Sequence, residues 1–526
     1  MKDPDPICTY ITPAYVDAAR AEGTKVAMKR ISKHDMDNAF MAQGVPLSDQ
    51  VHGIYRMFPP ELLHTTTEGL SVYMCNVFNK MLGRSEDPES CRREVDMIHS
   101  QFHESLKRNS ERDFPRTSNR TGFLRGTQIN ATERQGNMFI LLCICHTTEI
   151  QMLLSPLLLK INSSMDELIH CLKMYIAMEA WFHGTNSKDE VRAARPLVAE
   201  VIELLQKVFN RTEGQGWHIP KMHGLTKMQY YMCLFGSAMN FYGGPGECNH
   251  KKFVKDTANN TQQQISSFVS QLALRYYETM LFEIAKEATN RRFEKRFELI
   301  DKESDQARVK LTGSYTLKMK DVNQTVTHPE YSIEWTHNKK KKQSFDLKAR
   351  VLDTIIKFVN DEGWEDPFVA TGFTCMSSDL HGRKDIFRCT NSFHLDREEW
   401  YDWCMIEYDY GTDSASSTVV HPSKIHCFIQ FNTEGMLDDS EYDKDQVFVV
   451  IQSSRDPLPM STLESEFISD FQLGCDPDVD YKVVPIDSIV EPLMVFGKSH
   501  GCSNDYCCAL PKRKWGRYFG ERIELS

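Results

Sequence analysis

The pattern of apolar residues changes near Phe345, and this change constrains the fold more than any other feature of the chain. Before it, apolar residues recur at helical spacing, as in the run LVAEVIELLQKVFN that follows Pro196 and in Phe268 to Leu299. After it, short β-branched and aromatic runs such as CMIEYDY, VHPSKIHCFIQF and QVFVVIQSS alternate with turn residues, which is typical of antiparallel strands. The sequence therefore predicts an α+β protein, in which a mainly α-helical N-terminal region precedes a small β-rich C-terminal domain built as a barrel or a sandwich.

A chain of 526 residues is too long for one compact core, so we expect two or three domains. The predicted limits are a helical region over 1–215, a segment with a long helix over 216–300, a polar linker over 301–345 and the β-rich domain over 346–526. The linker contains Lys339 to Lys342, which suits a nuclear import signal, a phosphate contact or simply an exposed connection.

Charge is divided unevenly between the two parts of the chain. Residues 1–300 carry 36 Lys and Arg against 34 Asp and Glu, whereas residues 301–526 carry 26 against 39. A net acidic chain argues against indiscriminate binding of nucleic acid but allows local basic surfaces.

We expect an intracellular protein, nuclear or cytoplasmic, that does not enter a membrane. The N-terminal residues MKDPDPICTY contain no apolar core of a secretory signal. The most apolar stretch, Met138 to Ile161, is interrupted by polar residues and suits a buried core helix better than a membrane span. The 16 cysteines have no regular spacing, which favours reduced thiols.

Candidate catalytic residues follow the Gly-Gly-Pro-Gly turn at residues 243–246. Glu247 is predicted to open a helix in which His250 and Lys251, at i+3 and i+4, share its face. A carboxylate, an imidazole and an ammonium that converge at a helix start suit a metal ion and a phosphate. The alternative is structural, because the helix macrodipole alone favours a Glu in the first turn.

His218 and His223 are candidate metal ligands, since four intervening residues is a spacing that zinc sites use. A structural zinc needs four ligands, and no Cys-x-x-Cys pair accompanies them. Cys143, Cys145 and His146 lie in an apolar run where cysteine is expected to pack in the core. Near the C-terminus, Cys502, Cys507, Cys508 and the preceding His500 match no standard site.

A flexible polar segment between residues 107 and 134 is a candidate nucleic-acid contact. Arginine side chains on such a segment suit contacts to phosphates, although a solvated connector explains the composition equally well. Its seven basic residues are Lys107, Arg108, Arg112, Arg116, Arg120, Arg125 and Arg134.

Several phrases of the chain together resemble transposases of the Plavaka group, which are relatives of the CACTA cut-and-paste elements. They are VPLSDQVHGIYRMFPPELLHTTTEGL at 45–70, ERDFPR and ERQGNMFILLCICHTTE within 111–149, and KMHGLTKMQYYMCLFGSAMNFYGGPGECNHKKFVK at 221–255. The phrases WYDWCMIEY, HPSKIHCFIQF, VVPIDSIVEPLMVF and KRKWGRYF resemble the C-terminal part of the same proteins. The resemblance is collinear and covers most of the chain.

The resemblance implies an RNase H-like catalytic domain in which two aspartates and a glutamate bind two divalent metals, Mg²⁺ or Mn²⁺. Glu247 matches the terminal glutamate, and the helical region before it matches an insertion domain. His218 and His223 match the histidine half of a zinc site, so Zn²⁺ is expected there only if cysteine ligands are supplied. The implied partner is transposon-end DNA, with Lys252 and Lys255 as further contacts and a homo-oligomer as the assembly.

The chain departs from the family at the two aspartates. Asp35, Asp37 and Asp49 fall on a predicted helix and loop rather than at strand ends, so no aspartate pair is identifiable. We therefore expect a transposase-derived protein that lacks its N-terminal part, is catalytically incomplete and binds DNA. The alternatives are an active metal-dependent nuclease, if the gene start lies further upstream, and a protein-interaction protein with no role in nucleic-acid binding.

Overall fold

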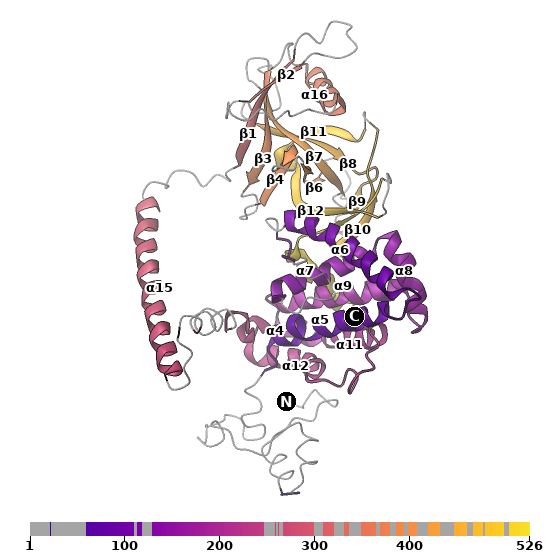
Figure 1. Ribbon diagram of the computed structural model, residues 1–526. Coiled ribbons are helices and arrows are strands. Elements are labelled where there is room, and N and C mark those ends of the chain that lie inside the picture. The colour runs from indigo at the N-terminus through magenta and orange to yellow at the C-terminus, as the bar shows by residue number, and fades with distance from the viewer. Residues whose placement is uncertain are drawn as a thin grey trace.

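A computed structural model shows how these segments are arranged. It describes residues 21–22, 59–109, 113–117, 129–246, 258, 261, 267–298, 309–319, 331–335, 349–363, 369–378, 385–393, 398–407, 419–431, 446–459, 466–476, 479–498 and 504–525. Helices fill the N-terminal half and an antiparallel sheet fills the C-terminal region, which confirms the predicted α+β class (Figure 1).

The helical part is a bundle in which most helices present an apolar side to a shared core. Its elements are α4 (Leu62–Thr65), the π-helix η2 (Thr66–Leu70), α5 (Ser71–Leu82), α6 (Pro88–Asn109), α7 (Ala131–Cys145), α8 (Thr148–Leu159), α9 (Met165–Phe182), α10 (Lys188–Ala193), α11 (Arg195–Val208), α12 (Pro220–Phe235), the 3₁₀ helix η4 (Ala238–Phe241) and the C-terminal α18 (Lys512–Leu525).

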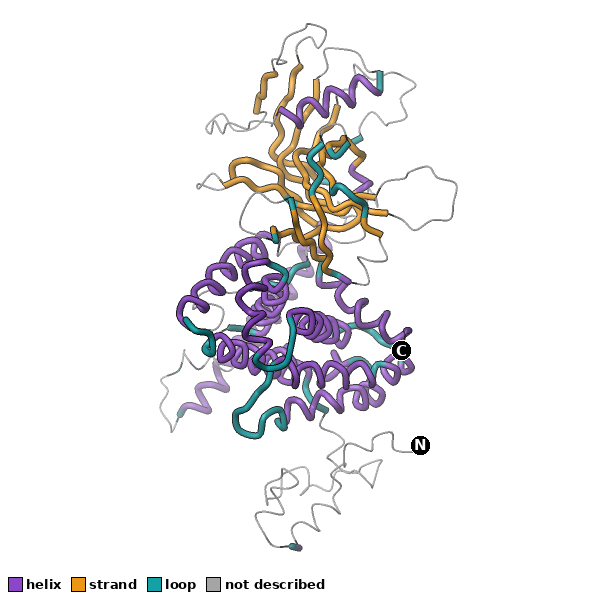
Figure 2. Tube along the Cα trace, turned by 90° about the vertical axis from the view of Figure 1, so that its right-hand side faces the viewer, coloured by secondary structure: helices purple, strands orange, loops and turns teal. Residues whose placement is uncertain are grey.

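The sheet lies above the helices in the views of Figures 1 and 2, with α16 (Ala349–Asp361) packed on it. The short 3₁₀ helix η8 (Ile486–Ser488) joins two of its strands. The strands are β1 (Lys310–Met319), β2 (Tyr331–Trp335), β3 (Val369–Ser378), β4 (Asp385–Phe393), β5 (Glu398–Tyr401), β6 (Trp403–Glu407), β7 (Val419–Phe431), β8 (Val447–Ser453), β9 (Leu458–Pro459), β10 (Ile468–Gln472), β11 (Tyr481–Pro485), β12 (Ile489–Gly497) and β13 (Asp505–Ala509).

All pairings between these strands are antiparallel. The main path of hydrogen-bonded neighbours runs β10-β13-β12-β6-β7-β3-β1-β2. Strands β8 and β9 also pair with β7, and β11 pairs with β8. Strand β7 pairs with β3, β6, β8 and β9, and both of its faces are buried. Cys427, Ile429 and Phe431 join α16 in one core, while Ile425 and Phe428 join the core of the other face. A bulge between Ile425 and Cys427 shifts the alternation that a regular strand would keep.

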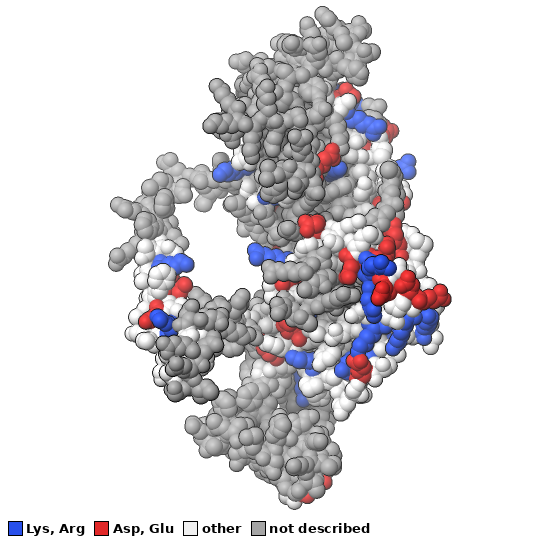
Figure 3. All heavy atoms as spheres, viewed as in Figure 1, with Lys and Arg blue, Asp and Glu red and all other residues white. Residues whose placement is uncertain are grey.

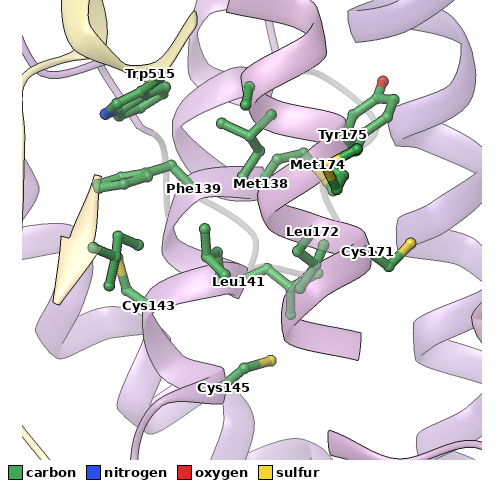
Figure 4. Packing of buried hydrophobic residues seen from close by; sticks show 14 of the residues in the cluster. Met138, Phe139, Leu141, Cys143, Cys145, Cys171, Leu172, Met174, Tyr175 and Trp515 are labelled. Atoms are coloured by element: carbon green, nitrogen blue, oxygen red, sulfur yellow. The ribbon is translucent and has the colours of Figure 1, made fainter. Parts of the chain in front are cut away.

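The C-terminal end of the chain completes the helical core. Helix α18 packs on α9, and Trp515 stacks on Phe139 of α7 with 4.5 Å between ring centroids (Figure 4). Strands β10, β12 and β13 contribute buried residues such as Phe471, Met494 and Cys508 to the same core. Residues more than 300 positions apart are therefore needed to bury the apolar faces of α7 and α9.

Several predictions about single elements are confirmed. Helix α11 begins next to Pro196, and α15 (Phe268–Glu298) covers the predicted long helix. Cys143 and Cys145 are fully buried in the core, as their apolar surroundings predicted. Figure 1 shows α15 standing apart from the bundle, and Val269 and Phe282 on it are 74 % and 69 % exposed.

Two segments differ from the predictions. Part of the predicted linker forms β1 and β2. Strand β1 pairs with both β2 and β3, and its Tyr315 and Leu317 are buried in the core that contains α16. The apolar stretch from Met138 to Ile161 is two helices, α7 and α8, which meet at 92°. Among the described residues no single helix is long and apolar enough to cross a membrane, and this bent pair passes that test only jointly.

Candidate functional site at the junction of α4, α9 and α12

Glu61 joins two segments that are 182 residues apart in the sequence. It is the N-cap of α4, where its carboxylate accepts hydrogen bonds from the backbone N–H groups of Leu63 (2.7 Å) and His64 (2.8 Å). The same carboxylate accepts a hydrogen bond from the backbone N–H of Gly243, at the start of the Gly-Gly-Pro-Gly turn. His64 adds its ring Nδ1 at 2.5 Å from Oε2. Glu61 thus holds the turn that leads to residue 247 against the start of α4.

The charge of Glu61 is stabilised by these donors. Partial burial by itself would raise the pKa of this carboxyl group, but the hydrogen bonds from Gly243, His64 and Leu63 outweigh it, so the pKa lies below its ordinary value. Glu61 is therefore ionised at neutral pH. Because both of its oxygens already accept hydrogen bonds, its role in this arrangement is to position the turn.

A buried polar network lies next to this junction, between η2 and α9. Glu179 is only 2 % exposed and accepts hydrogen bonds from the hydroxyl groups of Thr66 (2.8 Å) and Thr67. Ser71 and Tyr175 bond to each other through their hydroxyl groups at 2.9 Å. A π-helix is uncommon and often occurs at functional sites, and here it turns two consecutive threonines towards one carboxylate.

Helix α7 joins the junction through Arg134, which lies 3.3 Å from Glu68 of η2. The Arg134 side chain is 11 % exposed, so its guanidinium group pairs with Glu68 inside the protein rather than facing the solvent. Gly136 on the same helix lies under the 113–117 segment, where an added Cβ would lie 2.0 Å from the carbonyl oxygen of Arg116. The phrases ERDFPR and ERQGNMF therefore touch each other in the fold.

Helix α12 packs against α4, where an added Cβ on Gly224 would lie 3.1 Å from Pro60. His218 and His223 are both exposed at its start, beside the buried Trp217, whose indole N–H donates to the carbonyl of Phe209 at 2.8 Å. Among the described residues, no Cys, Asp or Glu joins the two histidines in a group of three ligands. Zn²⁺ at this pair stays a prediction.

The predicted catalytic residues and several basic residues lie outside the described part of the chain. These are Glu247, His250, Lys251, Lys252, Lys255, Arg112, Arg120 and Arg125. Lys107 and Arg108 lie in the last turns of α6, and Arg116 is exposed in the 113–117 segment. The structure thus brings together the segments around the predicted site, while the roles of these residues stay predictions.

A cavity of about 90 Å³ lies between α5 and the end of α11. Lys80, Arg84 and Arg211 line it, but Lys80 pairs with Glu213 and Arg211 lies over the ring of Tyr73 at 4.8 Å. On the face shown in Figure 3, acidic and basic side chains intermingle over the right-hand side of the helical part. Neither the cavity nor this face therefore presents a surface on which basic side chains gather without acidic ones.

Sequence reasoning missed Glu61 and Glu179. The signal for Glu61 was local but weak, since an acidic residue after Pro-Pro and before an apolar run indicates only that a helix starts nearby. Its bond to Gly243 depends on the tertiary fold. Glu179 lies in an apolar helix, where a lone Glu gives no indication of its partners. The structure also places His146, Asp470 and Cys507 close together, although they lie in different segments of the sequence.

The segments at 45–70, 111–149 and 221–255 meet at this junction, through Glu61 and Gly243 and through Arg134 and Glu68. Comparisons with protein families, with curated proteins and with solved structures give no match to this chain.

Proposed function

We propose that the chain is a transposase-derived protein that binds DNA in the nucleus. The observation that supports it best is the contact between segments that separately resemble Plavaka-type transposases. The PPELLHTTTEGL, ERQGNMF and GGPG phrases are joined by Glu61 with Gly243 and by Glu68 with Arg134. A chance likeness of scattered phrases would not require them to share one junction of the fold.

DNA contacts are assigned to the basic segment from Lys107 to Arg125 and to Lys252 and Lys255. Arginine on a polar segment provides phosphate contacts that are independent of base sequence. Arg116 is exposed, whereas Arg134 is engaged with Glu68. We therefore leave Arg134 out of the DNA contacts and assign it to the stability of the junction.

No cleavage step is derived for this protein. The described residues do not supply a cluster of carboxylates that fits a pair of Mg²⁺ or Mn²⁺ ions, since the one group of three metal-type ligands among them is His146, Asp470 and Cys507. We therefore propose DNA binding as the activity, while the catalytic roles of Glu247, His250 and Lys251, which lie outside the described residues, stay predictions.

The test compares two triple variants that each remove three positive charges. The R116Q/R120Q/R125Q variant changes the basic segment, and the K188Q/R192Q/K207Q control changes exposed residues of α10 and α11. Fluorescence anisotropy on duplex DNA should show at least tenfold weaker binding for the first variant only. The slope of log K against log salt should become shallower by about 0.9 for each phosphate that the variant no longer neutralises. Equal effects of the two variants, or no binding by the wild-type protein, would contradict the proposal.

A further inference from the structure

We propose that His146, Asp470 and Cys507 form a binding site for a divalent transition metal of the zinc class, where the helical part meets the sheet. One potential ligand atom from each of the three residues lies within 4.8 Å of the other two. Ligands around a tetrahedral zinc lie roughly 3.3–3.8 Å apart, as follows from metal–ligand bonds of about 2.0–2.3 Å. The site would need to contract by about 1 Å to close on the ion.

Three regular elements place the ligands. His146 is the C-cap residue of α7, while Asp470 and Cys507 are directly opposite each other on the paired strands β10 and β13. The backbone N–H of Thr148 donates to the carbonyl of Lys498 at 2.8 Å and so ties the turn after His146 to the end of β12. The ligands are therefore held by packed elements rather than by a loose loop.

The ligand atoms have the chemistry that a zinc-class ion prefers. Imidazole nitrogen, carboxylate oxygen and thiolate sulfur are all ligands of zinc, and His146 supplies the nitrogen. Its Nε2 atom is buried and has no hydrogen-bond partner among the described residues. The Cys507 thiol is fully buried beside Asp470, and a bound metal would take its thiolate form by displacing the proton.

Two lysines lie near the site, and each has its own acidic partner. Lys498 Nζ lies 2.5 Å from Oδ2 of Asp470, while Oδ1 of the same carboxylate faces His146 at 4.0 Å. Lys173 Nζ lies 2.8 Å from Glu466. These two pairs are close to neutral overall, so the thiolate of Cys507 would supply one negative charge against the two positive charges of the metal.

Cys143 is the residue best placed to supply a fourth ligand. It precedes His146 by three positions, which puts both on one side of the end of α7, and it is buried in the same core as Cys507. It is not within the 4.8 Å group, so it must move to coordinate, and otherwise water completes the site.

Cobalt(II) binding to the full-length protein tests the proposal, because thiolate ligation to Co²⁺ gives a charge-transfer band that oxygen and nitrogen ligands lack. We expect about one Co²⁺ per chain with this band for the wild type. The C508S variant is the matched control, since Cys508 is an equally buried neighbour on the same strand that lies outside the ligand group.

The band should be lost in C507S, kept in C508S and accompanied by at least tenfold weaker binding in H146Q and D470N. A weaker band in C143S would identify Cys143 as the fourth ligand, whereas an unchanged band would leave that position to water. An H218Q/H223Q variant should keep the band. Absence of a thiolate band in the wild type, or its survival in C507S, would overturn the proposal.

Discussion

Glu61 shows how one side chain can set the geometry of a distant segment. Its carboxylate caps α4 and binds the backbone of Gly243, so the orientation of the turn before residue 247 depends on a charge far away in the sequence. A hydrogen bond to a charged group contributes more than one between neutral groups. Loss of this carboxylate should therefore affect both stability and the position of the turn.

We expect Glu61→Gln to lower the free energy of unfolding at neutral pH by about 1–3 kcal/mol, because the amide leaves at least one of the donors without a charged acceptor. The pKa of Glu61 is lowered in the folded state, so its contribution is present above the pKa of the unfolded chain and is lost as pH falls through the folded value. The difference between the variant and the wild type should therefore shrink once pH falls below the ordinary pKa of a glutamate, about 4.3, and vanish only below the lower folded value.

Chemical denaturation at pH 7 and at pH 3.5 measures this difference. Glu190→Gln is the control, because Glu190 is the exposed third residue of a capping box on α10 and contacts only its own helix start. It should change stability little at either pH. A Glu61→Gln effect that is equal at both values would show that the carboxylate charge is not what holds the turn.

At the scale of elements, α15 differs from every helix of the bundle. It is 31 residues long, yet Val269, Leu274 and Phe282 are largely exposed, and its apolar residues are spread around the helix rather than gathered on one side. Helices in proteins gain most of their stability from tertiary packing of an apolar face. Among the described residues, little of that packing is available to α15.

We therefore expect backbone amides of α15 to exchange with solvent at least a hundredfold faster than those of α9 (Met165–Phe182), which is buried along most of its length. Hydrogen–deuterium exchange followed by mass spectrometry of peptides from each helix gives both rates in one experiment. Equal protection of the two helices in the isolated protein would mean that α15 is covered in solution.

The elements also show what the sequence could and could not predict. Helical spacing was enough for α11, and the apolar run around Cys143 correctly indicated core packing. Helix α15 exists as predicted, but its apolar residues do not form the single buried side that helical spacing implies. Strands β1 and β2 were missed, although Leu311, Tyr315 and Leu317 alternate with other residues along β1, because the surrounding segment is polar and rich in lysine. The pairing of Glu61 with Gly243 and the grouping of His146 with Cys507 depend on tertiary contacts, which no local pattern records.

At the scale of the whole molecule, segments near the C-terminus pack into the core of the N-terminal half. Helix α18 and strands β10, β12 and β13 complete the core that α7 and α9 begin, and the backbone N–H of Lys512 donates to the carbonyl of Asp113 at 2.9 Å. Trp515 and Phe519 lie fully inside this core. The N-terminal half therefore relies on residues from the C-terminal end to bury its apolar surface.

A fragment of residues 1–300 should unfold with little cooperativity, because it exposes the surfaces that α18 and the three strands cover. Differential scanning calorimetry of this fragment and of the full chain makes the comparison. We expect a broad, weak transition for the fragment and at least one sharp transition for the full chain. A sharp transition for the fragment at the same temperature would show that the helical part folds by itself.

The salt dependence of DNA binding by the wild-type protein tests the central claim most directly. Phosphate contacts release counterions, so affinity for duplex DNA must fall as salt rises. If about four basic residues contact phosphates, the slope of log K against log salt should be about −3.6, and affinity should fall more than a hundredfold between 50 and 200 mM salt. Binding that is undetectable at 50 mM salt, or that does not change with salt, would contradict the account.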